Sequence, residues 1–169
     1  MDSTLPDQKR EAARYHHDIA MCHHRDGDVA SAIEQYNQAI SILSDLVSSQ
    51  SSDPSHAPII KRAKFDLSSA YSGLSVALAD QSTAESDTAA LDFASKALEI
   101  RKTVMGPNHP SVAECLNTIG SLSFRSGNYN RAADAYQESL QILLTKTGGK
   151  EENKYVALAY RSEEHTSEL

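Results

Sequence analysis

Residues 97–142 read ALEIRKTVMGPNHPSVAECLNTIGSLSFRSGNYNRAADAYQESLQI, and glycine turns divide this stretch into helical segments. Gly106-Pro107 is a pair that ends a helix, and Pro110 suits the first turn of the next one, where a missing amide hydrogen costs little. Gly127 predicts a second turn, because glycine accepts the left-handed conformation that other residues resist. The stretch therefore predicts the end of one helix followed by a hairpin of two more.

The final helix of this stretch has a pattern that occurs three times in the chain, in segments 32–42, 90–100 and 132–142. Each segment begins with alanine, has a tyrosine or alanine four residues later, and has a second small residue seven after the first. Steps of four and seven place these residues on one stripe of an α-helix. We therefore expect Ala32, Ala90 and Ala132 to lie where helices approach closely, and Tyr36 and Tyr136 to fill the space between hairpins.

A turn precedes each of these helices. Gly27-Asp28 and Gly127-Asn128 place a glycine at the end of one helix and a capping residue at the start of the next. The middle turn, residues 80–87, contains no glycine, and we expect it to be about three residues longer than the other two. The Ser-rich interval that follows the first hairpin, residues 48–57, predicts a linker.

These motifs, with Val112-Ala113 and Leu116-Asn117, resemble the tetratricopeptide repeat, in particular the 42-residue subtype of kinesin light chains. Ser123 departs from the family pattern, which usually has an aromatic residue there. The resemblance implies an all-α fold, a right-handed superhelical solenoid of antiparallel helix hairpins with about three repeats and the first helix of a truncated fourth. The implied array covers residues 1–160, with repeats near 12–47, 60–105 and 109–146 and a partial repeat at 152–160.

The last nine residues, RSEEHTSEL at 161–169, match the in-frame translation of a widely used sequencing-library adapter. We therefore interpret this tail as an artefact and not as native protein. On this interpretation the natural chain continues beyond Tyr160.

Composition limits the classes of function. The net charge of −7 disfavours nucleic-acid binding, because that affinity comes largely from Lys and Arg displacing counterions. No apolar run is long enough to span a membrane, and no secretory signal is evident at the N-terminus. Cys22 and Cys115 are too few for a disulfide framework, so we expect a cytoplasmic protein in which both thiols are buried in helices.

The chain contains no motif that predicts catalysis, a metal site or a bound cofactor. Four histidines cluster in the sequence, but their separations of one, six, seven and eight residues do not suit a helical metal site, whose ligands lie three or four apart: His16, His17, His23 and His24. We therefore expect the four histidines to have separate roles and not to bind one metal ion together. The sequence therefore predicts a protein that is not an enzyme.

The resemblance implies that the first helix of each hairpin lines a groove that binds a peptide or helix of a partner protein. The groove positions of the family pattern fall on Arg14, His17, Met21, His24, Arg25, Glu114, Asn117, Ser121, Phe124 and Arg125. Asn117 is of most interest, because its amide both donates and accepts hydrogen bonds. The function implied is a scaffold or adaptor; the alternative is a regulatory or sensor segment of a larger enzyme or signalling protein. An array without a closing helix also predicts self-association through its C-terminal edge.

Overall fold

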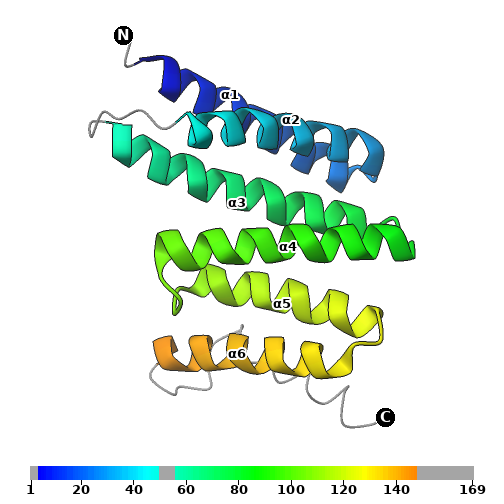
Figure 1. The fold of residues 1–169 in the computed structure, drawn as a ribbon. Helices are drawn as coiled ribbons and strands as arrows, with labels where there is room; N and C mark the ends of the chain where they lie inside the picture. The colour runs from blue at the N-terminus through cyan, green and yellow to red at the C-terminus, as the bar shows by residue number, and fades with distance from the viewer. Residues whose placement is uncertain (1–3, 50–55, 148–169) are drawn as a thin grey trace. The chain divides into compact units, whose positions relative to one another are not determined.

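The computed structural model describes residues 4–49 and 56–147, with the side chains of residues 146 and 147 left out. This part of the chain contains six α-helices and no β-strand: α1 (Thr4–Arg25), α2 (Val29–Ser48), α3 (Ala57–Ala79), α4 (Ala84–Met105), α5 (Pro110–Arg125) and α6 (Tyr129–Thr147) (Figure 1). The prediction of an all-α fold built from helix hairpins is confirmed. The chain divides into a first unit, residues 1–100, and a second unit, residues 101–169.

In the first unit, α1, α2 and α3 lie side by side (Figure 1). Two hydrophobic clusters join them. The Leu43 cluster consists of Ala13, Leu43, Leu46, Ala63 and Leu67, and the Tyr36 cluster consists of Ala20, Ala32, Tyr36, Leu74 and Ala77. Each cluster draws on all three helices, so burial of apolar surface holds α3 against the hairpin formed by α1 and α2.

The small residues predicted to mark close helix approach are buried. Ala32 and Ala90 are 0% exposed and Ala132 is 1% exposed. Larger side chains at these positions would separate the helices, because protein interiors leave few voids that could accept extra atoms. The prediction made from the four- and seven-residue steps is confirmed for all three positions.

The predicted turns are also confirmed. Gly27, Gly106 and Gly127 have φ angles of 83°, 91° and 76°, in the left-handed region. The Asp28 carboxylate accepts a hydrogen bond from the Ser31 amide at 3.1 Å, and the Asn128 side-chain oxygen accepts one from the Arg131 amide at 3.3 Å. These side chains cap α2 and α6, as the sequence predicted.

The middle turn is shorter than predicted, because only residues 80–83 separate α3 from α4. Ser82 takes the place of the missing glycine with a φ of 54°. Thr83 and Ser86 cap α4 reciprocally: the Ser86 amide donates to Thr83 Oγ1 at 3.1 Å, and the Thr83 amide donates to Ser86 Oγ at 3.0 Å. This pair resembles a capping box, and it starts the helix earlier than composition suggested.

The two tyrosines of the repeated pattern pack in different ways. The ring of Tyr36 in α2 lies directly against Gly73 of α3, the first helix of the following hairpin. The ring of Tyr136 in α6 lies against Gly120 of α5, so that a Cβ at Gly120 would be 2.7 Å from Cε1 of the ring. The prediction that both tyrosines fill space between hairpins is confirmed for Tyr36. Tyr136 packs against the first helix of its own hairpin, and the chain that follows α6 lies outside the described residues.

In the second unit, α5 packs against α6. Ser139 Oγ of α6 donates a buried hydrogen bond of 3.0 Å to the Ala113 carbonyl of α5, and this small residue allows the helices to approach. Cys115 is buried as expected, but Cys22 is exposed on α1, so the expectation of two buried thiols was wrong for Cys22. Helical spacing alone did not show that the outer face of α1 is uncovered.

The Ser-rich linker and the C-terminal residues lie largely outside the part of the chain that the structure describes. α2 continues to Ser48, and residues 50–55 of the Ser-rich linker lie outside the described residues, as do the partial repeat at 152–160 and the adapter-like tail at 161–169. In the part of the chain that the structure describes, no helix combines the length and the apolar character that a membrane span requires.

Candidate functional site

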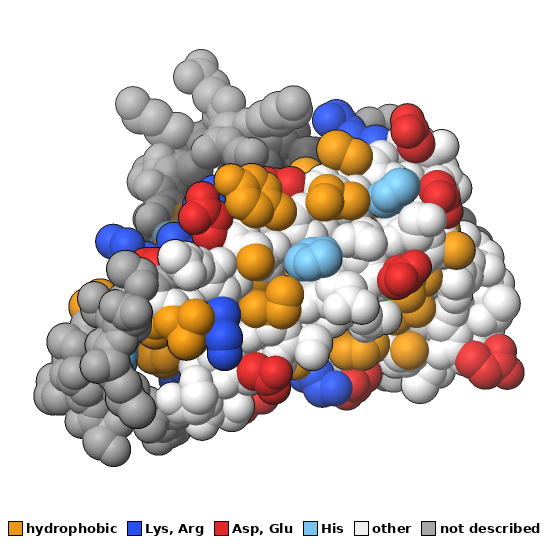
Figure 2. All heavy atoms as spheres, turned by 90° about the horizontal axis from the view of Figure 1, so that it is seen from above, with side chains coloured by type: hydrophobic (Ala, Val, Ile, Leu, Met, Phe, Trp, Pro, Cys, Tyr) orange, Lys and Arg blue, Asp and Glu red, His pale blue; other side chains and the backbone are white. Residues whose placement is uncertain are grey.

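Three of the residues predicted to line a groove on α1 are exposed: Arg14, Met21 and Arg25. Steps of seven and four place them on one face of the helix. Met21 is 46% exposed, so its thioether side chain reaches the surface of α1. Figure 2 looks from above onto the α1–α2 side of Figure 1, where hydrophobic side chains and histidines reach the surface among polar ones.

His17 lies at the inner edge of this face, half-buried against the ring of Tyr36. The two ring centroids are 5.5 Å apart, and the ring planes meet at 65°. Burial lowers the pKa of His17, and the charges of Asp18 and Asp66 oppose this shift. The imidazole is therefore held neutral near pH 7. Its Nδ1 is buried and has no hydrogen-bond partner among the described residues.

The other three histidines of α1 each have a different neighbour. His16 Nδ1 lies 2.8 Å from Gln35 Oε1, His23 Nδ1 lies 3.7 Å from Asp28 Oδ2, and His24 Nε2 lies 2.7 Å from Asp80 Oδ2. His24 thus links the end of α1 to the residue that follows α3. The side chain of His24, which the sequence predicts for the binding groove, is therefore engaged by Asp80. Within residues 4–49 and 56–147, no three residues of the types that hold metal ions converge on one site.

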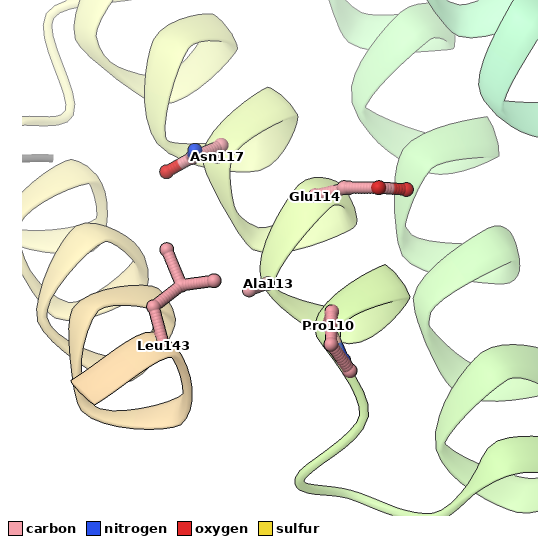
Figure 3. Close-up of a pocket in the computed structure, with 5 residues that line it drawn as sticks. All are labelled: Pro110, Ala113, Glu114, Asn117 and Leu143. Carbon is pink, nitrogen blue, oxygen red and sulfur yellow. The ribbon is translucent and has the colours of Figure 1, made fainter. Parts of the chain in front are cut away.

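The second unit contains a pocket of about 130 Å³ lined by Pro110, Ala113, Glu114, Asn117 and Leu143 (Figure 3). Asn117 and Leu143 both point into the space between α5 and α6 (Figure 3). Asn117 Oδ1 is buried and has no hydrogen-bond partner within the described part of the chain. A buried acceptor without a donor is costly, so a ligand that supplies an N–H group here would gain a hydrogen bond.

Glu114 points away from Asn117 and Leu143 (Figure 3). Its Oε2 accepts a hydrogen bond of 3.1 Å from the Arg101 guanidinium, which also donates to the Ser111 carbonyl at 2.9 Å. Arg101 is 7% exposed, so a charge is buried where α4 ends and α5 begins. Glu114 therefore stabilises this buried charge, a role that the groove assignment did not include.

The last turns of α5 carry the other predicted groove residues. Ser121 is exposed and hydrogen-bonds to Tyr136, whose pKa is raised by burial and lowered in part by this bond. The Phe124 ring meets Tyr129 edge to face, with centroids 5.3 Å apart. Arg125 is exposed in the final turn, where a positive charge interacts favourably with the helix dipole.

The structure also shows an exposed apolar stripe on α1 that the sequence pattern did not predict. Its members recur at steps of three, four and seven along the helix: Leu5, Ala12, Tyr15, Ile19 and Cys22. Leu5, Tyr15 and Ile19 are 55%, 61% and 44% exposed. Their periodicity was readable, but the same spacing describes a buried face, and only the structure shows that this one is uncovered.

Comparison with protein families gives two matches, both to models described as tetratricopeptide repeat. One covers residues 66–145 and the other residues 13–42, so together they span more than half of the chain. The chain belongs to the tetratricopeptide repeat family. A comparison with curated proteins gives no match.

Tetratricopeptide repeats generally mediate protein–protein interaction, and the family typically acts as a non-catalytic scaffold. The two matches include every residue predicted to line a groove, from Arg14 on α1 to Arg125 on α5. The repeat framework accounts for the buried alanines and the glycine turns of this chain.

Proposed function

We propose that this chain is a scaffold or adaptor module that binds a protein partner, as an extended peptide or a helix, and that the exposed face of α5 is one surface that binds it. The observation that carries the proposal is the Oδ1 of Asn117, which lines the α5–α6 pocket and has no hydrogen-bond partner among the residues that the structure describes. An amide at a pocket rim suits the backbone N–H of a bound peptide, and Leu143 supplies an apolar surface beside it.

The exposed face of α1 also supports the proposal that this chain binds a protein partner, through charged and flexible apolar side chains instead of a polar pocket. Arg14 and Arg25 offer positive charge, and Met21 offers a flexible apolar contact between them. Methionine adapts its shape to varied apolar partners, and arginine pairs with carboxylates through two parallel hydrogen bonds. A partner for this face would therefore combine acidic and apolar side chains.

We further propose that the array belongs to the kinesin-light-chain-like 42-residue subtype and acts in the cytoplasm. The Gly106-Pro107 and His109-Pro110 pairs support the first of these assignments. His109 caps α5 by accepting a hydrogen bond from the Ser111 amide at 3.2 Å, and Pro110 occupies the first helical turn. The exposed thiol of Cys22, which is not in a disulfide, supports a reducing compartment.

The test is selection of ligands from a random peptide display library on the immobilised chain, followed by affinity measurements on labelled peptides in solution. Asn117→Ala should weaken a selected peptide about tenfold, the effect expected for loss of one hydrogen bond. Arg14→Glu should weaken peptides that contain acidic residues. Asn37→Ala, a matched change at an exposed position of α2, should leave affinity unchanged. Failure to select any peptide, or equal binding by all three variants, would refute the proposal.

A further inference from the structure

The exposed apolar stripe of α1 keeps one spacing along most of the helix. Together with the exposed side chain of Gln8, its members follow one another at alternating steps of three and four residues: Leu5, Gln8, Ala12, Tyr15, Ile19 and Cys22. Steps of this kind form a seam against which a second helix can pack, as in a coiled coil. In α5, the residues numbered 100 higher than the last four of these are buried: Val112, Cys115, Ile119 and Leu122. The stripe is therefore a helix face of a kind that the chain buries elsewhere, and in the first unit it is exposed.

The two flanks of this seam differ in charge. One flank is acidic over two turns, with Glu11 and Asp18, and ends at Arg25. The other carries only basic or titratable nitrogen groups: Lys9, His16 and His23. When two identical helices pair in parallel, a residue on one flank lies beside the residue about five positions later on the opposite flank of the other helix. Glu11 then meets His16 of the second copy, and Asp18 meets His23 of the second copy, so that each carboxylate gains an imidazole donor. The Nδ1 atoms of these two histidines lie beside groups of their own chain, which leaves Nε2 to reach a second copy.

An antiparallel pair would bring together groups that do not complement one another. In a pair of that orientation that keeps the seams in contact, like flanks meet. Glu11 would lie beside Asp18 of the second copy at two symmetric places, and these carboxylates repel. The Gln8 amide would face Ile19, which offers no hydrogen bond. A parallel pair instead places each seam residue against its own counterpart, so the two Gln8 amides can bond to each other and fix the register.

We propose that α1 is a dimerisation surface, on which two copies of this chain pair through their apolar stripes in parallel and in register. Tyr15 and Ile19 become buried in the pair, and Cys22 lies beside Cys22 of the second copy in the last layer of the seam. Arg14 and Met21 lie off the seam, so the exposed face of α1 that they form stays open. The dimer presents that face twice, and two linked faces bind a repeated partner more tightly than one.

Sedimentation equilibrium of the full chain tests the surface. We expect a reversible dimer with a dissociation constant on the order of tens of micromolar, because one helix pair is a small interface. Ile19→Asp and Tyr15→Asp should each raise this constant at least tenfold, because each would bury a carboxylate in the seam. Val76→Asp is the matched control, since Val76 of α3 is 41% exposed and Ile19 is 44% exposed. It should leave the constant unchanged. A chain that stays monomeric at millimolar concentration, or a dimer that both stripe variants leave intact, would overturn the proposal.

Oxidative cross-linking tests the orientation. With diamide, whose azo group takes up the two thiol hydrogens, the parallel pair should form a disulfide between the two Cys22 side chains. Cys115 is buried, so Cys22→Ser should abolish the cross-linked dimer, and Ile19→Asp should reduce it at least tenfold. An antiparallel pair would hold the two Cys22 residues about 26 Å apart along the helix axis, so a dimer that does not cross-link would overturn the parallel arrangement. Asp18→Lys should weaken the parallel dimer severalfold, and a tighter dimer in this variant would also count against it.

Discussion

The α1–α2 and α5–α6 hairpins share a framework and differ in the face that they present. Three buried positions of the α1–α2 hairpin have counterparts in the α5–α6 hairpin whose residue numbers are 100 higher. Ala13, Ala32 and Leu43 correspond to Ala113, Ala132 and Leu143, and all six residues are buried. The exposed positions change in charge and polarity, since Arg14 and Met21 correspond to Glu114 and Ser121. The comparison shows that packing restricts the buried face of each hairpin, while the exposed positions are free to differ between the two hairpins.

The hairpins also differ in what covers them. Ala20 corresponds to Gly120, and the absence of a side chain at Gly120 lets Tyr136 rest on its own partner helix. In the first hairpin, Ala20 belongs to the same cluster as Tyr36, and the ring of Tyr36 lies against both Gly73 of α3 and His17 of α1. In each case a glycine lets the tyrosine ring approach a helix closely.

The largest predicted effect compares Leu43 with Leu143. Leu43→Ala should lower the free energy of unfolding by about 3 kcal/mol, because the side chain is enclosed by three helices. Leu143→Ala should cost about 2 kcal/mol, because Leu143 borders a pocket and has fewer atoms around it. Denaturant unfolding of both variants measures these values. A cost at Leu143 equal to or greater than the cost at Leu43 would contradict the comparison.

The next effect concerns the glycines beneath the tyrosines. Gly73→Ala and Gly120→Ala should each destabilise the protein by about 1–3 kcal/mol, because the added methyl group would collide with Tyr36 or Tyr136. In chains that carry Tyr36→Leu or Tyr136→Leu, the matching glycine substitution should become neutral or stabilising, since alanine favours helix by about 1 kcal/mol. Thermal unfolding of the single and double variants tests this prediction. Glycine effects that ignore the tyrosine background would contradict it.

A smaller effect distinguishes the two helix caps. Asn128→Ala should cost about 1 kcal/mol at any pH, because the lost cap is uncharged. Asp28 behaves differently, since hydrogen bonds from Ser31 lower its pKa below the ordinary value of 3.8. Its contribution is complete above pH 3.8 and is lost as the pH falls through the lower folded-state value. Asp28→Asn should therefore reduce the acid sensitivity of stability, and an unchanged pH profile below 4 would be evidence against this account.

The smallest effect compares His17 with Asn117, its counterpart in α5. Burial lowers the pKa of His17 from 6.5, so the unfolded chain binds a proton before the folded chain does as the pH falls. Stability from the neutral ring is complete above pH 6.5 and declines below it. His17→Asn should flatten the dependence of the unfolding midpoint on pH just below 6.5. The reciprocal Asn117→His should introduce such a dependence, and identical pH profiles for the parent chain and both variants would contradict this prediction.

The α-helical hairpins, their turns and their buried alanines were predictable from the sequence because each follows from local chemistry. A left-handed turn needs glycine at Gly27 or Gly127, a helix start is stabilised by Asp28 or Asn128, and close helix contact requires small residues at fixed steps. These constraints act within a few residues of one another. They are therefore visible in the order of the amino acids alone.

The tertiary structure decided the features that depend on residues distant in sequence. Sequence order did not reveal that Asp80 binds His24, that Arg101 engages Glu114, or that Cys22 is exposed. Periodicity identifies a face of a helix but not what covers it, because an exposed apolar stripe and a buried one have the same spacing. Which faces are covered depends on the packing of neighbouring helices, and in this protein that difference separates the open pocket beside Leu143 from the filled core around Leu43.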